Sequence, residues 1–174
     1  MKLLAVFLLV FSMVALTSGK TVSINGTPGD GQWEFMLYQV GSISCPFGWT
    51  LINNRCFQYV ANNMTWAEAE RNCLTLGANL ASVHNSNEYN QIQTLIFTAS
   101  RDSKETWIGG SNAQEDNIWL WSDGNLFSYT NWCRGQPDNT RGMQHCLQMN
   151  YSGGKCWDDF SCRGPKPSVC AKKP

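Results

Sequence analysis

The sequence predicts a small α+β domain, and two observations support this prediction. Patterns typical of two helices come first and are followed by several short strand-like segments. Eight cysteines lie between residues 45 and 170, which is typical of a compact, disulfide-bonded fold with many loops. The chain shows no internal repeat and no low-complexity tract. We therefore expect one globular domain over residues 45–174.

The helices are predicted by their start and stop signals. Thr65-Trp66-Ala67-Glu68 is a capping box, which predicts a helix that continues to about Leu76 and stops at Gly77. A second helix is predicted to start at Asn85 or Ser86, with Glu88 in its first turn. Its buried face is expected to carry Tyr89, Ile92, Leu95 and Ile96.

The strands are predicted by short apolar and aromatic segments. A hairpin-like turn is expected at Asn53-Asn54, before Cys56. After Arg101 the segments are separated by Gly, Asn and Asp. They are residues 107–109, 118–121, 146–150, 155–157 and 168–171.

The N-terminal residues have the pattern of a secretory signal peptide. Lys2 precedes the apolar run 3–16, and small residues follow up to Gly19. A membrane anchor is the alternative, but about 14 apolar residues are fewer than the ~20 that a spanning helix needs. We expect residues 1–19 to be a signal peptide, the mature protein to be secreted and extracellular, and no membrane span. Residues 20–44 are interpreted as an N-terminal arm, either a propeptide or a homo-oligomerisation segment.

Composition excludes several function classes. Secretion exposes thiols to oxidant, so an even number of cysteines without a C-x-x-C pair indicates four disulfides rather than a zinc cluster. The formal net charge is +0 and no Lys/Arg block occurs, so nucleic acid is not an expected partner. Only His84 and His145 are available as neutral-pH bases, and no nucleophile elbow appears. We do not expect an enzyme.

Five motifs occur in the order found in one known family. They are Trp107-Ile108-Gly109, Trp119-Leu120-Trp121-Ser122-Asp123-Gly124, Asn131-Trp132, Gln136-Pro137-Asp138 and Trp157-Asp158-Asp159. With these motifs, residues 45–172 resemble the C-type lectin domain family, and the chain looks like the secreted fish lectins and the fish type II antifreeze proteins. The resemblance implies the C-type lectin fold, with two helices, short antiparallel strands and a long loop region.

The resemblance also implies the disulfide pairing. The expected pairs are Cys73 with Cys170, Cys146 with Cys162, and Cys45 with Cys56. Cys133 and Cys156 remain, and their extra pairing is shared with the antifreeze subgroup. The two positions of that subgroup's further bridge are Ala113 and His145 here, so both partners of it are missing.

One calcium site is implied by the same resemblance. Calcium is bound by six to eight oxygens, and the implied ligands are Gln136, Asp138, Gln144, Asp158 and Asp159. In the family the proline between the first two is cis. This chain departs from the pattern because it has Gln144 where the family has Glu and Asp158 where the family has Asn. Three carboxylates are nevertheless retained, and the alternative is a vestigial loop with solvated acids.

Carbohydrate binding is implied at Gln136, Asp138, Gln144 and Asp158. The Gln-Pro-Asp order is typical of galactose, but we hypothesise that the two inverted positions weaken that selectivity. No aromatic residue follows the triplet, so Tyr151, His145 or Phe160 would have to provide the platform for the sugar, whereas core or loop packing is the alternative role of each. An auxiliary calcium site near Asn112, Asp116 and Asn139 is expected to be weak or absent.

The expected function is therefore a secreted lectin that binds galactose or a related glycan through calcium, with a role in innate defence. Ice binding on the same fold is the alternative, and a protein-binding module with structural calcium is a third interpretation. The chain is also expected to be a glycoprotein. Sequons occur at Asn25, Asn63 and Asn150; Asn63 is expected to be modified, and a glycan at Asn150 would obstruct the site.

Overall fold

Residues 44–174 are described by the computed structural model, and they contain two α-helices and eight short strands. The expected signal peptide, nearly all of the expected arm and the sequon at Asn25 lie outside these residues. The helices and strands are β1 (Thr50–Ile52), β2 (Arg55–Met64), α1 (Trp66–Thr75), β3 (Asn79–Leu80), α2 (Ser86–Ser100), β4 (Thr106–Ser111), β5 (Leu120–Trp121), β6 (Cys146–Tyr151), β7 (Cys156–Phe160) and β8 (Lys166–Lys172).

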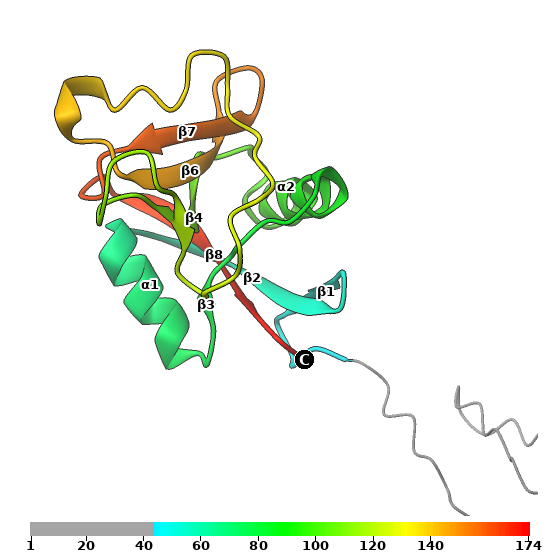
Figure 1. Ribbon diagram of the computed structural model, residues 1–174. Helices are drawn as coiled ribbons and strands as arrows, with labels where there is room; N and C mark the ends of the chain where they lie inside the picture. The colour runs from blue at the N-terminus through cyan, green and yellow to red at the C-terminus, as the bar shows by residue number, and fades with distance from the viewer. Residues whose placement is uncertain (1–43) are drawn as a thin grey trace, which may run out of the picture. The chain divides into compact units, whose positions relative to one another are not determined.

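The strands form one mixed sheet in the order β1-β2-β8-β4-β6-β7 (Figure 1). β3 pairs with β8, and β5 pairs with β4. Among the strand pairs of the described residues, β4 and β8 run parallel and the others run antiparallel. β7 is therefore an edge strand, and its outer edge is free to support a loop.

Both predicted helices are confirmed, with the predicted caps. The Thr65 side chain accepts from Glu68 N, and the Glu68 carboxylate accepts from Thr65 N at 3.0 Å. Gly77, at φ +65°, follows the end of α1 in a conformation that favours glycine. α2 begins after Asn85, whose side chain accepts from Glu88 N at 2.9 Å.

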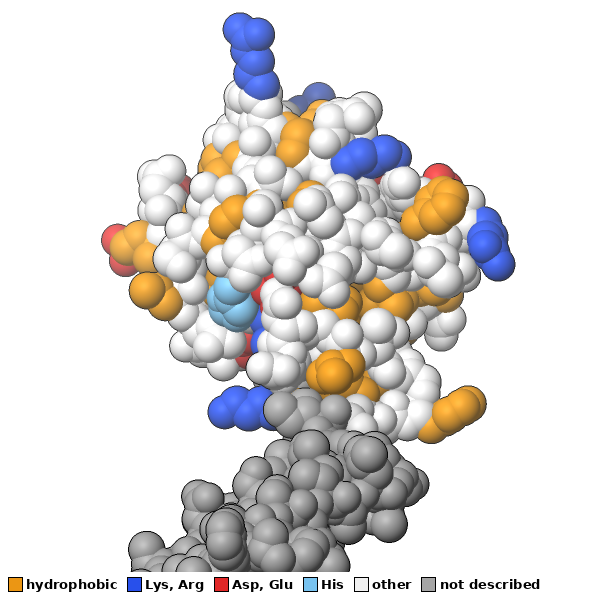
Figure 2. Space-filling view, turned by 90° about the vertical axis from the view of Figure 1, so that its right-hand side faces the viewer, with side chains coloured by type: hydrophobic (Ala, Val, Ile, Leu, Met, Phe, Trp, Pro, Cys, Tyr) orange, Lys and Arg blue, Asp and Glu red, His pale blue; other side chains and the backbone are white. Residues whose placement is uncertain are grey.

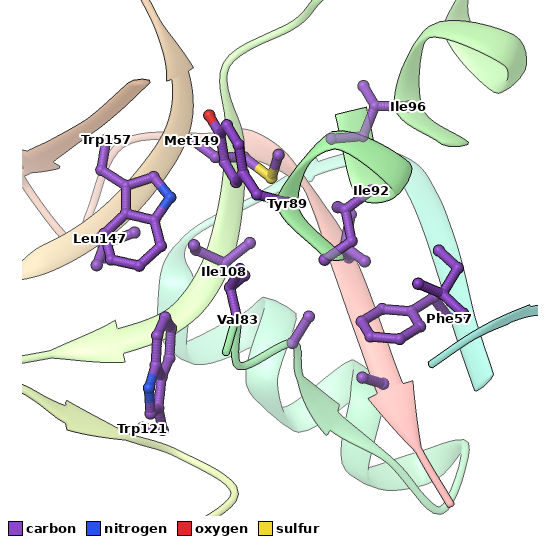
Figure 3. Close-up of a cluster of buried hydrophobic side chains, with 14 residues drawn as sticks. Phe57, Val83, Tyr89, Ile92, Ile96, Ile108, Trp121, Leu147, Met149 and Trp157 are labelled. Carbon is purple, nitrogen blue, oxygen red and sulfur yellow. The ribbon is translucent and has the colours of Figure 1, made fainter. Parts of the chain in front are cut away.

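Each helix packs against a different hydrophobic cluster of the sheet. α2 buries Tyr89, Ile92 and Ile96 in the larger cluster, which also contains Ile108 and Trp157 (Figure 3). α1 buries Ala69 and Cys73 in the second cluster, together with Trp107. The prediction for the buried face of α2 is thus confirmed, although Leu95 is only half-buried.

Several strand boundaries differ from the prediction. The segment predicted from Ile118 contributes only Leu120 and Trp121, because Ile118 N closes a turn on Glu115 O at 3.2 Å. β7 starts one residue later than predicted, because Lys155 is in the tight turn at φ 54°. β3 was not predicted, since a two-residue strand has no periodicity to detect.

All four implied disulfides are confirmed: Cys45–Cys56, Cys73–Cys170, Cys133–Cys156 and Cys146–Cys162. No cysteine in the described residues is free. Cys73–Cys170 joins α1 to β8, and Cys133–Cys156 joins the long loop, residues 122–145 between β5 and β6, to β7. The long loop is thereby covalently attached to the edge of the sheet.

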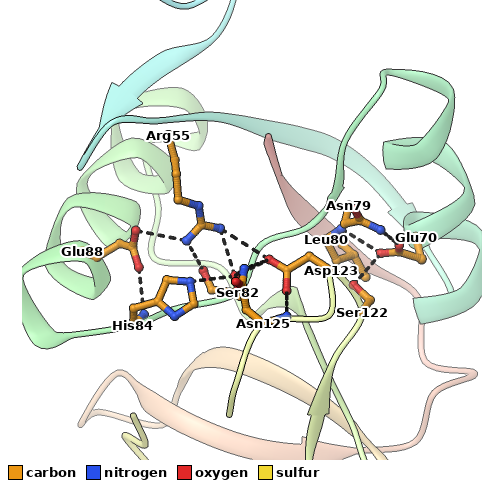
Figure 4. A network of polar contacts seen from close by, with 10 residues as sticks. All are labelled: Arg55, Glu70, Asn79, Leu80, Ser82, His84, Glu88, Ser122, Asp123 and Asn125. Carbon is orange, nitrogen blue, oxygen red and sulfur yellow. Dashed lines mark hydrogen bonds and ion pairs between the residues drawn. The ribbon is translucent and has the colours of Figure 1, made fainter. Parts of the chain in front are cut away.

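Aromatic packing and a polar network also position the long loop. Trp157 is fully buried and makes edge contacts with four rings, those of Tyr89, Trp121, Tyr129 and Trp132. At the start of the loop, Asp123 lies 3.8 Å from Arg55 and accepts from the Ser82 hydroxyl (Figure 4). Arg55 also forms an ion pair with Glu88 of α2 at 3.2 Å. These contacts fix the loop against β2 and α2.

Candidate functional site

The candidate site is built where the segment 131–139 follows the free edge of β7. Trp157 N donates to Asn131 O at 2.7 Å, and Cys133 N donates to Trp157 O at 2.9 Å. The Gln136–Pro137 peptide bond is cis, as the resemblance implies. The backbone then turns so that the N–H groups of Asp138 and Asn139 donate to the Asp159 carboxylate at 3.0 and 2.8 Å. Asp159 is fully buried beneath this turn.

Thr140 brings together two of the expected ligands. Its backbone N–H donates to Asp138 Oδ1 at 3.0 Å and to Gln144 Oε1 at 2.7 Å. Its hydroxyl also donates to Asp138 Oδ1, at 2.7 Å, and this hydrogen bond lowers the pKa of the Asp138 carboxyl below its ordinary value. Gln136 Nε2 donates to Asp138 Oδ2 at 3.3 Å. Gln136, Asp138 and Gln144 therefore form one hydrogen-bonded group.

Asp158 has a different environment from the other four. It is 3% exposed and pairs in register with Gln148 of β6, whose Nε2 donates to Asp158 Oδ2 at 2.6 Å. Burial raises the pKa of the Asp158 carboxyl to about 6; the bond from Gln148 opposes this rise, and the charges of Asp159 and Asp138 add to it. The negative charges of Asp138 and Asp159 are therefore near enough to affect the Asp158 carboxyl.

Hydrogen bonds connect four of the expected ligands, Gln136, Asp138, Gln144 and Asp159, through the backbone and side chains of residues 138–140, whereas Asp158 is bonded to Gln148 and to none of the other four. In residues 44–174, no three His, Cys, Asp or Glu side chains are arranged as a group that could hold a metal ion. Asp138 and Asp159 accept from the loop backbone, Gln144 accepts from Thr140, and Asp158 accepts from β6.

Calcium fits the chemistry of this donor set. Gln136 Oε1 is buried and has no hydrogen-bond partner in the described part of the chain, a situation that costs about 1–3 kcal/mol. The ion pairs of the described residues involve other acids, so no Lys or Arg among them neutralises Asp138, Asp158 or Asp159. An unpartnered amide oxygen beside uncompensated carboxylates suits a hard cation that is bound by oxygen.

Two of the three residues considered as sugar platforms are engaged elsewhere. Phe160 packs against Trp107 and lies 4.1 Å beneath the Lys166 ammonium. His145 Nδ1 lies 3.1 Å from Asn112 Oδ1 and 3.6 Å from Asp116. Asn112 and Asp116 are two of the three residues considered for an auxiliary calcium site. The side chain of the third, Asn139, accepts from Gln144 N at 3.0 Å. Tyr151 is half-buried at the end of β6.

The one Ser, His and Asp cluster at the loop start does not have the geometry of a nucleophile. Asp123 accepts from Ser82 and not from His84 (Figure 4). Arg55 Nη2 donates to the same Ser82 hydroxyl at 3.0 Å, and His84 Nε2 lies 3.1 Å from it. The single proton of the Ser82 hydroxyl is donated to Asp123, so His84 can only donate to this hydroxyl, and the cluster is a structural network rather than a nucleophile with its base.

The Asn150 side chain lies inside the protein, although the sequence has a sequon at this position. Asn150 is 3% exposed and has φ 64°, a backbone conformation that asparagine tolerates. Its amide nitrogen donates to Lys104 O at 3.2 Å, and its amide oxygen accepts from Gln93 at 3.1 Å. The side chain is therefore a structural link within the protein. Asn63, in contrast, is exposed near the end of β2.

On the face shown in Figure 2, the Lys and Arg side chains are scattered singly. No helix within residues 44–174 is long and apolar enough to cross a membrane.

Two residues of this region were missed by sequence reasoning. Thr140 has no role in the calcium site expected from the sequence, yet it connects Asp138 with Gln144. Gln148 interrupts the apolar positions Leu147 and Met149 and is 1% exposed. A buried glutamine in a short strand is a detectable signal, because buried polar side chains need partners.

Comparisons with known proteins agree with the fold. The family described as Lectin C-type domain matches residues 62–172. The galactose-specific lectin nattectin of Thalassophryne nattereri is 43% identical over 129 residues, which is 74% of this chain and 80% of that protein. A type-2 ice-structuring protein of Hemitripterus americanus is 38% identical over 169 residues, 97% of this chain and 98% of that protein. The solved structure of herring type II antifreeze protein has a TM-score of 0.70 at 39% identity, over 75% of this chain and 99% of that one.

Proposed function

Because this chain belongs to the C-type lectin domain family, a family of binding domains rather than enzymes, we propose that it is a secreted, calcium-dependent lectin for galactose-type sugars. The observation that carries this proposal is the Gln136–Asp138 turn. The turn has a cis peptide bond, a buried Gln136 Oε1 that has no hydrogen-bond partner among residues 44–174, and a link to Gln144 through Thr140, so one loop offers several oxygen ligands. Two relatives, nattectin and the lactose-binding lectin l-2 of Anguilla japonica, support the sugar class.

The residues of the loop have distinct roles in this proposal. Gln136, Asp138, Gln144, Asp158 and Asp159 would hold the ion, and bound calcium would supply the positive charge that attracts sugar hydroxyls. Asp138 offers a carboxylate that accepts from a sugar hydroxyl, and Gln136 offers an amide that donates to one. The Thr140 hydroxyl orients Asp138 and lowers the pKa of its carboxyl.

Retention on a galactose resin tests the proposal. We expect the wild-type protein to bind in calcium and to elute with chelator or with lactose. Asp138→Asn should reduce retention at least tenfold, because it removes one of three carboxylates from the site. Asp102→Asn is the matched control, since Asp102 is an exposed acid just after α2. Retention that ignores both chelator and Asp138→Asn would reject the lectin assignment.

Sugar selectivity is tested separately by a glycan array. Compared with the family pattern, this chain has an amide in place of a carboxylate at Gln144 and a carboxylate in place of an amide at Asp158. Hydrogen-bond donors and acceptors are therefore exchanged at two places in the site. We therefore propose that selectivity for galactose over mannose is weak and that Gln144→Glu strengthens it. Strong galactose selectivity with no response to Gln144→Glu would remove this part of the proposal.

Ice binding is the second candidate function. The specific observation in its favour is the 38% identity to an ice-structuring protein across nearly the whole chain. Thermal hysteresis with faceted ice crystals, measured on a sample that does not bind sugar, would favour this candidate. Sugar binding without hysteresis would favour the lectin.

A further inference from the structure

Gln148 and Asp158 form a buried polar pair that the apolar core does not require. They face each other across β6 and β7, are 1% and 3% exposed, and share a hydrogen bond of 2.6 Å. Within the described residues, the Asp158 carboxylate makes this one side-chain hydrogen bond. Its neighbours Asp138, Asp159 and Glu105 are also acids, and Lys166 is paired with Glu105 at 2.8 Å. Gln148 is thus the group that stabilises this buried carboxylate.

Gln148 is also costly to keep. Its Oε1 is buried without a hydrogen-bond partner in residues 44–174, which makes the glutamine unfavourable as a core residue. An apolar residue of similar volume would fill the same space without that penalty. A role in packing alone therefore does not explain a glutamine here, whereas a role toward Asp158 does.

The hydrogen bond distinguishes the two oxygens of Asp158. Oδ2 accepts from Gln148, which leaves Oδ1 available to another partner. The bond also restricts the rotation of the carboxylate, because its donor comes from a side chain on the neighbouring strand. A ligand held in one orientation loses less freedom when it binds an ion.

We propose, resting on the proposed function, that Gln148 is a positioning residue that holds Asp158 in the orientation in which it binds calcium. Gln148 itself does not touch the ion. The departure of this chain from the family at position 158 is then matched by a donor at position 148. A neutral asparagine at position 158 would accept a weaker hydrogen bond from that donor than a carboxylate does, so the two positions should be energetically coupled.

A double-mutant cycle tests this inference, with calcium affinity measured by calorimetry. Gln148→Leu should weaken calcium binding about 10- to 100-fold when Asp158 is present, which is the usual effect of removing a group that orients a metal ligand. In the Asp158→Asn background, the same Gln148→Leu change should alter calcium affinity less than about twofold. Urea unfolding of all four proteins in calcium-free buffer provides a readout independent of the metal: Gln148→Leu should destabilise the wild-type background more than the Asp158→Asn background.

Each outcome decides the inference. Equal calcium affinity in wild type and Gln148→Leu, or an equal loss in both backgrounds, overturns the positioning role while calcium binding itself stands. If Gln148→Leu does not fold, Gln148→Met replaces it in the cycle, because methionine is also unbranched and apolar. A wild-type protein that binds no calcium refutes the proposed function first, and the positioning role with it.

Discussion

Asp158 is a carboxylate whose side chain lies almost entirely inside the protein, and a single hydrogen bond from Gln148 satisfies it. Asp138 is its opposite, because it is exposed and receives two hydrogen bonds from Thr140. The pKa of Asp158 is raised while the pKa of Asp138 is lowered. Two carboxylates of one proposed site therefore respond differently to pH.

The pH dependence of stability tests the environment of Asp158. Its pKa is about 6 in the folded protein and 3.8 ordinarily. A carboxyl group whose pKa is higher in the folded protein than in the unfolded chain contributes to stability while it is protonated. That contribution is complete at pH values below the pKa of the unfolded chain, and it is lost as the pH rises through the pKa of the folded protein. Urea unfolding in calcium-free buffer should show wild type losing stability relative to Asp158→Asn between about pH 4 and pH 7. Parallel pH profiles for the two proteins would contradict this assignment.

The two sequons of the described residues make a second prediction about single residues. Asn63 is exposed, and the Asn150 amide is hydrogen-bonded inside the protein. In protein secreted from eukaryotic cells, we expect a glycan on Asn63 and none on Asn150. Peptide mapping before and after N-glycosidase digestion measures both. A folded, secreted protein with Asn150 occupied would show that its burial is wrongly described.

At the scale of elements, the packing of β4 depends on Gly109. A Cβ at this position would lie 2.6 Å from the backbone oxygen of Leu80 and 2.8 Å from Ser122 Oγ. Gly109 also accepts from Ser122 N at 2.9 Å, so it connects β4 to the beginning of the long loop. The close approach explains why glycine follows Trp107-Ile108 in the motif.

Gly109→Ala should therefore destabilise the protein by about 1–3 kcal/mol, because Leu80 O is backbone and cannot move aside cheaply. Gly153→Ala is the matched control, since no atom lies within 4 Å of its Cβ. Chemical unfolding of the two variants compares them directly. Equal stability of both variants would contradict the packing described for β4.

Secondary structure was predictable where local chemistry determines it. The capping box at Thr65, the cap at Asn85 and the paired asparagines at 53 and 54 each act within a few residues, and all three predictions are confirmed. β3 was not predicted, and the segment that contains β5 was predicted too long, because each strand exists only through pairing with a distant strand. Such pairing leaves no local pattern in the sequence.

The same distinction applies to the site. The family resemblance implies the cis peptide at Pro137, which the structure contains, and it implies Gln136, Asp138 and Gln144 as ligands of one site. The orientation of Asp158 was not predictable, because it depends on Gln148 from another strand. The burial of Asn150 was missed for the same reason, since Gln93 and Lys104 are far from it in sequence.

At the scale of the whole molecule, the disulfides differ in what they stabilise. Cys73–Cys170 has a sequence separation of 97 and joins α1 to β8. Cys45–Cys56 has a separation of 11 and connects two neighbouring segments. In the chain-entropy model, a bridge that closes a longer loop removes more freedom from the unfolded chain.

Removal of each bridge by paired serine substitutions tests this difference. Cys73→Ser with Cys170→Ser should cost about 4–5 kcal/mol, and Cys45→Ser with Cys56→Ser about 3 kcal/mol. Both cysteines of the long bridge are fully buried, so lost packing adds to the larger cost. Urea unfolding measures both variants. An equal or larger cost for the short bridge would show that chain entropy does not govern the stability of this fold.

The proposed function requires one calcium ion and one sugar to bind at the edge of β7. Isothermal calorimetry of calcium, followed by galactose, lactose and mannose on the same sample, measures both events. We expect one calcium per chain, sugar heat only after calcium, and the loss of both in Asp138→Asn. The absence of calcium heat from the folded wild-type protein, or equal sugar binding in chelator, would contradict this function.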